Sequence, residues 1–182
     1  MNLGLGRQAV IVTGAASGIG AAIARLLAAE GVGGLVVTDR DGAGLAKIGA
    51  ELSPLVPVEA VEADLGDSAA PAAIATAATA RFGRIDGLVN AAGLTTRGSF
   101  ETATPAIWDA LFAVNARAGF FLMQAVIADM RARGAGGAIV NILSMNAHCG
   151  IPELAVYSAS KGAMVTLTKN AAHAHMADRI RV

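Results

Sequence analysis

The sequence predicts a single three-layer α/β domain in which helices cover both faces of a doubly wound parallel sheet. Five short runs rich in Val, Ile or Leu alternate with longer helical segments along the 182 residues. Strands that alternate with helices need crossover connections, which make the strands parallel. A hydrophobic content of 54% with only 15% charged residues favours a large buried core. We therefore expect one domain over residues 1–182.

The expected strands are short apolar runs bounded by Gly, Asp or Asn. They are Gln8–Thr13, Leu35–Asp39, Val56–Ala63, Ile85–Asn90 and Ala138–Leu143. The expected helices are Gly18–Glu30, Gly42–Leu52, Ser68–Phe82, Thr104–Arg133 and Val156–Met176. Asp67–Ser68 and Thr104–Pro105 are typical helix starts. Arg179–Val182 resembles the opening of a sixth strand, beyond which we expect further strands that the sequence does not include.

Charge and hydropathy argue against two classes of partner. The formal net charge is zero and the basic residues are scattered, so we expect no nucleic-acid partner. The apolar stretch Phe120–Met130 is interrupted by Gln124 and Asp129 and is too short to span a bilayer, so we expect no membrane partner. The N-terminus lacks a signal-peptide pattern and Cys149 is the single cysteine, which favours a cytoplasmic location.

A glycine-rich turn, Thr13–Gly20, joins the first expected strand to the first helix. Glycines at such a turn let the backbone approach a pyrophosphate, and the helix N-terminus offers it free N–H groups. Its spacing is Gly-x-x-x-Gly-x-Gly, which differs from the general dinucleotide fingerprint. Alone, this turn could also be a simple strand–helix connection.

Asp39 ends the second expected strand, nineteen residues after Gly20. A carboxylate there can bind the ribose hydroxyls of NAD and repels the 2′-phosphate of NADP. The adjacent Arg40 could partly accommodate that phosphate. We expect NAD as the cofactor, with NADP as the less favoured alternative.

Tyr157, the only tyrosine, and Lys161 lie four residues apart and share one face of a helix. Ser144 ends the fifth strand, on the sheet edge where α/β folds bind ligands. Bringing a tyrosine from its ordinary pKa of about 10 to about 7 requires about 4 kcal/mol of phenolate stabilisation. A lysine cation about 5 Å away supplies about 3 kcal/mol at an effective dielectric near 20. These residues therefore suit proton transfer to or from an alcohol.

These motifs resemble those of the short-chain dehydrogenase/reductase family. The family's Thr-Gly-x-x-x-Gly-x-Gly turn matches Thr13–Gly20, its Asn-Ala-Ala-Gly segment matches Asn90–Gly93, and its Tyr-x-x-x-Lys pair matches Tyr157–Lys161. The match covers nearly the whole chain and implies a Rossmann fold. Leu143 departs from a common Ser-Ser pattern, but Ser144 keeps the second serine.

The resemblance implies a role for each catalytic candidate. Tyr157 would be the general acid/base, Lys161 would assist it and hold the nicotinamide ribose, Ser144 would orient substrate, and Asn115 would link Lys161 to a water chain. The implied cofactor-binding residues are Gly14, Ser17, Gly18, Ile19, Gly20, Asp39, Arg40, Asp64, Leu65, Asn90, Ala91, Gly93, Tyr157 and Lys161. Asn146 and His148, which follow Ser144, are further substrate candidates, and no metal site is expected.

The leading hypothesis is reversible oxidation of a secondary alcohol, such as a sugar or polyol, with NAD. The alternatives are reduction of a ketone or acyl substrate with NADPH, and a non-catalytic dinucleotide-binding protein. The resemblance also implies a homodimer or homotetramer that buries the helices at 104–133 and 156–176. Family members usually continue into a substrate-covering C-terminal segment, which this sequence lacks.

Overall fold

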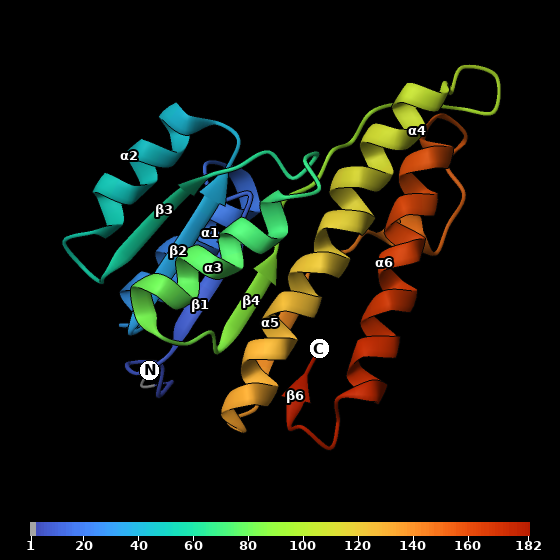
Figure 1. Ribbon diagram of the computed structural model, residues 1–182. Coiled ribbons are helices and arrows are strands. Elements are labelled where there is room, and N and C mark those ends of the chain that lie inside the picture. Colours follow the sequence, from blue (N-terminus) through green and yellow to red (C-terminus); the bar gives the residue numbers. More distant parts are fainter. Residues whose placement is uncertain (1–2) are drawn as a thin grey trace.

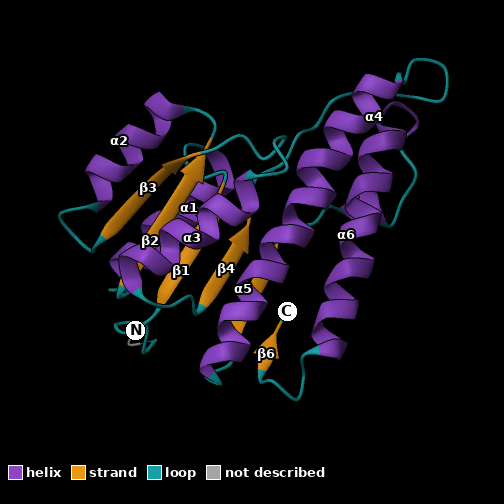
Figure 2. Ribbon diagram, in the orientation of Figure 1, coloured by secondary structure: helices purple, strands orange, loops and turns teal. Residues whose placement is uncertain are grey.

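The computed structural model describes residues 3–182 as a six-stranded parallel sheet between two layers of helices (Figures 1 and 2). The strand order is β3-β2-β1-β4-β5-β6. The strands are β1 (Ala9–Thr13), β2 (Gly34–Asp39), β3 (Val58–Glu62), β4 (Gly87–Asn90), β5 (Gly137–Asn141) and β6 (Ile180–Arg181). The order reverses between β1 and β4, which leaves a crevice at the ends of these strands where doubly wound sheets bind ligands.

The two faces of the sheet carry different helices (Figure 1). The helices are α1 (Gly18–Ala29), α2 (Gly42–Leu52), α3 (Ala70–Phe82), α4 (Pro105–Phe112), α5 (Gly119–Arg133) and α6 (Ala155–Ala174). Val10 and Val12 of β1 pack with α1 and α2, whereas Ile11 between them packs with α3 and α5. This alternation follows from the two-residue side-chain period of a strand.

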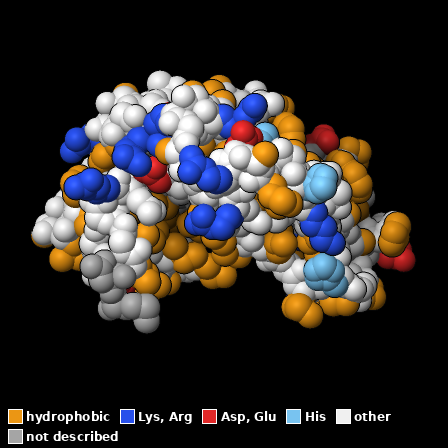
Figure 3. All heavy atoms as spheres, turned by 90° about the horizontal axis from the view of Figure 1, so that it is seen from below, with side chains coloured by type: hydrophobic (Ala, Val, Ile, Leu, Met, Phe, Trp, Pro, Cys, Tyr) orange, Lys and Arg blue, Asp and Glu red, His pale blue; other side chains and the backbone are white. Residues whose placement is uncertain are grey.

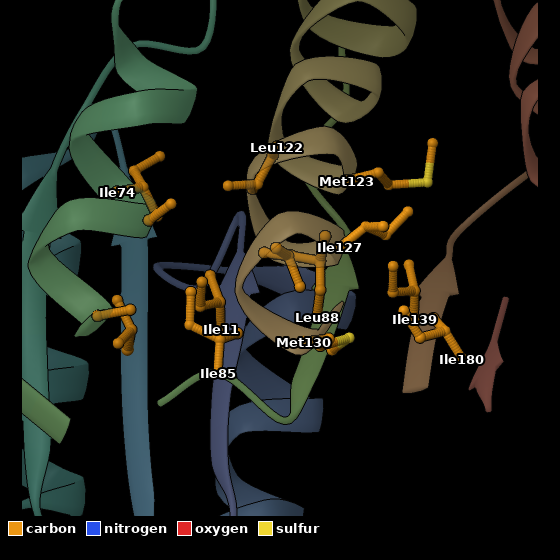
Figure 4. Close-up of a cluster of buried hydrophobic side chains, with 14 of the residues drawn as sticks. Ile11, Ile74, Ile85, Leu88, Leu122, Met123, Ile127, Met130, Ile139 and Ile180 are labelled. Atoms are coloured by element: carbon orange, nitrogen blue, oxygen red, sulfur yellow. The ribbon is translucent and has the colours of Figure 1, made fainter. Parts of the chain in front are cut away.

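Figure 4 shows the core on the second face, where isoleucine, leucine and methionine side chains meet between the sheet and the helices. Ile74 of α3 and Leu122 of α5 are fully buried there, and Leu88 of β4 is only 1% exposed. Ile139 and Ile180 extend this cluster to β5 and β6, so the predicted sixth strand is part of the sheet. The layered fold predicted from the alternating runs is therefore confirmed.

The expected helix Thr104–Arg133 is not one regular α-helix. Between α4 and α5 lies a π-helical segment, η1 (Ala113–Ala118), which contains Asn115. A π-helical turn inserts a residue, which widens the helix and changes where side chains point. Asn115 lies in this turn and hydrogen-bonds the loop after β4, as described below. The apolar periodicity of the sequence does not indicate the inserted residue.

The remaining expected bounds agree with the structure to within two residues; the fifth strand ends at Asn141 instead of Leu143, so Ser144 follows the strand and does not end it. Two further differences concern the third strand and the third helix. The third strand is limited to Val58–Glu62 and lies at the edge of the sheet, where its residues are half-buried or exposed instead of forming a buried strand. The third helix begins at Ala70 instead of Ser68. The side chain of Asp67 accepts a hydrogen bond from the amide of Ala69, which holds the preceding residues in a turn.

The helical run Pro105–Arg133 is long and apolar enough to cross a membrane when only its 29 residues and the mean hydropathy of 1.5 in its most apolar 18-residue window are considered. Nearly half of its most apolar window, 44%, is buried inside the protein. Leu122, Val126 and Met130 of this run lie in the core against the sheet. A core helix has the same features, so the run is weak evidence for a membrane span.

The edge of the sheet where the strands begin carries a buried ion cluster. Asp86 is 8% exposed and accepts hydrogen bonds from the Ala9 amide, from Arg84 and from Arg133. Arg133 also binds Asp129, four residues before it on α5. Burial alone would raise the pKa of Asp86, but the hydrogen bonds from Arg84 and Ala9 and the two arginine charges outweigh it and lower the pKa.

Seen from below, basic and hydrophobic side chains intermingle on the surface of the protein (Figure 3).

Candidate functional site

The glycine-rich turn lies at the end of β1, and its glycines are required by geometry. Gly14 has a φ of +68°, and a Cβ there would lie 2.8 Å from the Cα of Ala92. A Cβ on Gly20 would collide with the backbone of Gly14. Gly18, with a φ of +53°, faces open space, and Ser17 and Ile19 beside it are exposed. The turn is therefore tightly packed on its inner side and open on its outer side.

Thr13 joins this turn to the segment after β4. Its buried hydroxyl accepts hydrogen bonds from the amides of Ala91 and Ala92, both at 3.1 Å. The same hydroxyl donates to the carbonyl of Val89 at 3.5 Å. One side chain thus holds the two edges of the β1/β4 crevice at a fixed separation.

A cavity of about 200 Å³ opens at this crevice. Seven of the cofactor-binding residues predicted from sequence line it: Gly14, Ser17, Asp39, Arg40, Asp64, Leu65 and Gly93. The lining also includes Val114 of η1 and Thr38 of β2, which the motifs do not single out. The Thr38 hydroxyl is buried and has no hydrogen-bond partner within residues 3–182. Alternation along β2 could have marked Thr38, whereas no sequence signal marked Val114, which lies in the π-helical segment.

Two carboxylates at the cavity are held by backbone amides. Asp39 accepts hydrogen bonds from the amide of Ala16 at 3.0 Å and from that of Asp41 at 3.1 Å. Asp64 accepts one from the amide of Gly66 at 2.8 Å. Because both carboxylates are bound through main-chain donors, their positions do not depend on the conformation of a long side chain.

Lys161 and Asn115 meet at Gly93. The Nζ of Lys161 donates to the carbonyl of Ile142, just after β5, at 2.7 Å. Asn115 binds the main chain of Leu94 with both side-chain polar atoms and also donates to the hydroxyl of Ser160 at 3.0 Å. A Cβ on Gly93 would lie 3.3 Å from the Asn115 oxygen and 3.5 Å from the Lys161 Nζ, so Gly93 lies directly beside both side chains.

Lys161 is only 7% exposed, and burial lowers the pKa of its ammonium group. It forms no ion pair with an acidic side chain in the described part of the chain, so its charge is balanced only by dipoles. A buried cation without a counter-ion stabilises any anion formed beside it. This electrostatic feature distinguishes the site from a structural salt bridge.

Tyr157 and Ser144 occupy neighbouring elements at the same edge of the sheet. Tyr157 is half-buried in the first turn of α6, and its hydroxyl has no hydrogen-bond partner within residues 3–182. The Ser144 hydroxyl accepts from the amide of Asn146 at 3.2 Å, at the start of the short 3₁₀ helix η2 (Met145–Ala147). Asn146 is half-buried, and His148 after η2 is exposed. Both hydroxyls thus keep a proton that another group can accept.

A parallel sheet that switches order at a glycine-rich turn, with a buried lysine four residues after a tyrosine, defines a dinucleotide-binding oxidoreductase of the Rossmann type. The family profile for short chain dehydrogenases matches residues 8–182. The chain therefore belongs to the short-chain dehydrogenase/reductase family of oxidoreductases, and the family resemblance drawn from its motifs is confirmed.

Relatives illustrate the range of this family. The chain is 37% identical over 177 residues to a D-xylose 1-dehydrogenase of Caulobacter vibrioides, a match that covers 95% of the chain and 68% of that protein. A metagenomic short-chain oxidoreductase in complex with NADP is 39% identical with a TM-score of 0.91, over 98% of the chain and 80% of that structure. NAD⁺-bound xylitol dehydrogenase is 29% identical with a TM-score of 0.92, over 98% of the chain and 68% of that structure. Both nicotinamide dinucleotides therefore occur among similar structures.

Proposed function

We propose that the protein oxidises a secondary alcohol, of the sugar or polyol type, with NAD, and that Tyr157 is its general acid/base. The observation that carries this proposal is the buried cation of Lys161, which within residues 3–182 has no acidic partner, one helical turn after a tyrosine whose hydroxyl bonds none of these residues. The similarity to proteins named for D-xylose and xylitol supports a polyol substrate.

The residues divide the chemistry between them. NAD, when bound, supplies the acceptor for the hydride that leaves the alcohol carbon. The Tyr157 phenolate takes the hydroxyl proton, and the Lys161 ammonium stabilises that phenolate. Ser144 donates its hydrogen to the substrate oxygen, because its hydroxyl accepts a bond from the Asn146 amide and donates to no group within residues 3–182. Asn115 holds the loop at Leu94, which lines the cavity.

NAD is the proposed cofactor because of Asp39. Its carboxylate lines the cavity and accepts hydrogen bonds from the amides of Ala16 and Asp41, which hold it where it would repel a 2′-phosphate. Two alternatives remain. The exposed Arg40 lines the same cavity and could bind that phosphate, which favours a second candidate function, reduction of a ketone or acyl substrate with NADPH. The other alternative is a protein that binds the dinucleotide without catalysing a reaction.

We also propose a cytoplasmic homodimer or homotetramer formed through α5 and α6. Phe120 and Phe121 of α5 are 39% and 45% exposed. A groove between the two helices is lined by Phe120, Ile127 and Leu167, among others. Burial of these apolar side chains against the same face of a second copy would remove them from water.

Titration with the two cofactors, followed by turnover with a panel of alcohols, tests the proposed activity. We expect NAD to bind more tightly than NADP, and Tyr157→Phe to lose turnover by at least about a hundredfold while still binding NAD. Tighter binding of NADP would favour the reductase. Unchanged turnover in Tyr157→Phe would rule out the proposed catalytic role, and binding without any turnover would favour a binding protein.

A further inference from the structure

Two side-chain hydroxyls, those of Thr38 and Ser158, are buried without a hydrogen-bond partner among residues 3–182. Thr38, unlike Ser158, lines the cavity at the β1/β4 crevice. It is 1% exposed and is the next to last residue of β2. A buried hydroxyl that makes no bond has lost its bonds to water, which is costly, so its presence in a native protein requires an explanation.

The neighbouring strands offer the hydroxyl of Thr38 no partner. Thr38 is level with Thr13 of β1 and Val61 of β3, and side chains at level positions share one face of the sheet. The Thr13 hydroxyl already accepts from two amides and donates to the carbonyl of Val89, and Val61 is apolar. Val36, two residues earlier on the same face, lies in the apolar core. These surroundings suit a valine at position 38 at least as well as a threonine.

The strand order places Thr38 at one end of the crevice (Figure 1). Strand β2 lies between β1 and β3, whereas Lys161 bonds the segment after β5, on the other side of β1 and β4. The cavity beside Thr38 is also lined by Asp39, proposed above to exclude a 2′-phosphate, and by residues 63–65 after β3. A dinucleotide whose reacting ring lies near Lys161 would therefore have its adenosine half over β2 and β3.

We propose that Thr38 is a further cofactor-binding residue, whose hydroxyl forms its hydrogen bond only with the adenosine half of the bound dinucleotide. Rotation about the Cα–Cβ bond moves a threonine hydroxyl between staggered positions, so it can turn toward a ligand without movement of the strand. The inference rests on the proposed function only for the identity of the ligand. It implies that Thr38 lowers the stability of the free protein and raises its affinity for the dinucleotide.

Thr38→Val and Thr38→Ser form a matched pair, because valine removes the hydroxyl at nearly equal volume whereas serine keeps it. We expect Thr38→Val to weaken NAD binding about fivefold to tenfold, as for the loss of one hydrogen bond, and Thr38→Ser to bind within about twofold of the unsubstituted protein. ADP-ribose lacks the nicotinamide ring, and Thr38→Val should weaken its binding by the same factor. Isothermal titration calorimetry measures both ligands without turnover.

The melting temperature without ligand is a second measurement, which a merely structural hydroxyl would change in the opposite direction. Thr38→Val removes no hydrogen bond from the free protein, so its melting temperature should be equal or higher. Thr13→Val is the control, because it removes a bonded hydroxyl from the neighbouring strand and should lower the melting temperature. A comparable drop in Thr38→Val would show that its hydroxyl already has a partner without ligand, and would overturn the proposal.

Turnover separates this inference from the proposed function. If Tyr157→Phe keeps full turnover, the proposed catalytic role fails, yet the binding of NAD and ADP-ribose to Thr38→Val still decides the role of Thr38. If Tyr157→Phe is inactive and Thr38→Val binds both ligands like the unsubstituted protein, the role of Thr38 fails alone. Weaker binding of NAD with unchanged binding of ADP-ribose would also contradict the proposal, because the bond would then involve the nicotinamide half.

Discussion

Asn115 and Leu94 bind each other twice: the Oδ1 of Asn115 accepts from the Leu94 amide at 2.8 Å, and its Nδ2 donates to the Leu94 carbonyl at 2.9 Å. The pair joins the π-helical turn η1 to the loop after β4, next to Gly93 and Lys161. The side chain of Asn115 thus makes the two hydrogen bonds that a neighbouring strand would otherwise make with the main chain of Leu94. These bonds hold a loop that belongs to neither a strand nor a helix.

Asn115→Ala should therefore lower the free energy of unfolding by about 1–3 kcal/mol, because the amide and carbonyl of Leu94 lose their partner. Chemical denaturation measures this. The control is Asn170→Ala on α6, an exposed asparagine that bonds only the carbonyl of Thr166 in its own helix. Equal stability losses in the two variants would contradict the assigned importance of the Leu94 contact.

Gly14→Ala should mainly lower thermal stability, whereas Gly18→Ala should mainly weaken NAD binding. Gly14→Ala places a Cβ against the Ala92 backbone and should lower the melting temperature strongly. Gly18→Ala meets no protein atom within 4 Å, so it should cost about 1–2 kcal/mol of left-handed strain and should weaken NAD binding. Calorimetric titration with NAD and thermal unfolding distinguish them. Unimpaired NAD binding in Gly18→Ala would argue against a pyrophosphate at the open side of the turn.

Asp39→Ser should change cofactor preference, because it removes the carboxylate that repels a 2′-phosphate and leaves Arg40 in the cavity. We expect the ratio of the NADP to the NAD dissociation constant to fall about tenfold, which corresponds to about 1.4 kcal/mol. Asp41→Asn removes an equal charge two residues away, where the carboxylate caps α2, and should leave the ratio unchanged. A similar shift in both variants would mean that general charge, and not the position of Asp39, sets the preference.

Asp86 should make the protein sensitive to acid. Its pKa in the folded protein is below the ordinary value of 3.8, so its contribution to stability is present above pH 3.8 and is lost as the pH falls through the lower, folded value. Asp86→Asn should cost about 1–3 kcal/mol at neutral pH and should flatten this decline. Thermal unfolding between pH 7 and the acid limit checks both. Asp109→Asn, on an exposed residue of α4, is the control and should change neither quantity.

Phe120→Asp should dissociate the proposed oligomer, because it places a charge on the apolar groove between α5 and α6. Sedimentation velocity should show a shift to monomer. Leu26→Asp tests the same substitution on α1, where Leu26 is 61% exposed outside that groove, and should leave the oligomer intact. The proposal of an oligomer would be wrong if the unsubstituted protein already sedimented as a monomer.

Sequence patterns predicted the position of a residue correctly where that position depends on its neighbours along the chain. The alternating apolar runs predicted the strands and helices, and Thr13–Gly20 predicted a turn whose glycines have the expected geometry. The predicted residues Asp39, Asp64 and Gly93 do line one cavity. In each case the residue is placed by the end of a strand and by the main-chain conformation. Both follow from neighbouring residues in the sequence.

Contacts between distant segments could not be found in this way. Asn115, within the π-helical segment Ala113–Ala118, bonds Leu94 and Ser160, which lie outside that helix. The partnership of Asn141 with Thr168 spans 27 residues and leaves no periodic signal.

The sequence by itself determined the order of strands and helices, the family, and the residue types available for proton transfer, because these follow from periodicity and motif spacing. Only the tertiary structure decided that Lys161 is buried with no counter-ion among the residues described, and that Asn115 and Asn141 are fully engaged in bonds. The reason is physical. Burial and hydrogen bonding are properties of a side chain's complete surroundings, and at this site those surroundings come from β4, β5, η1 and α6 together.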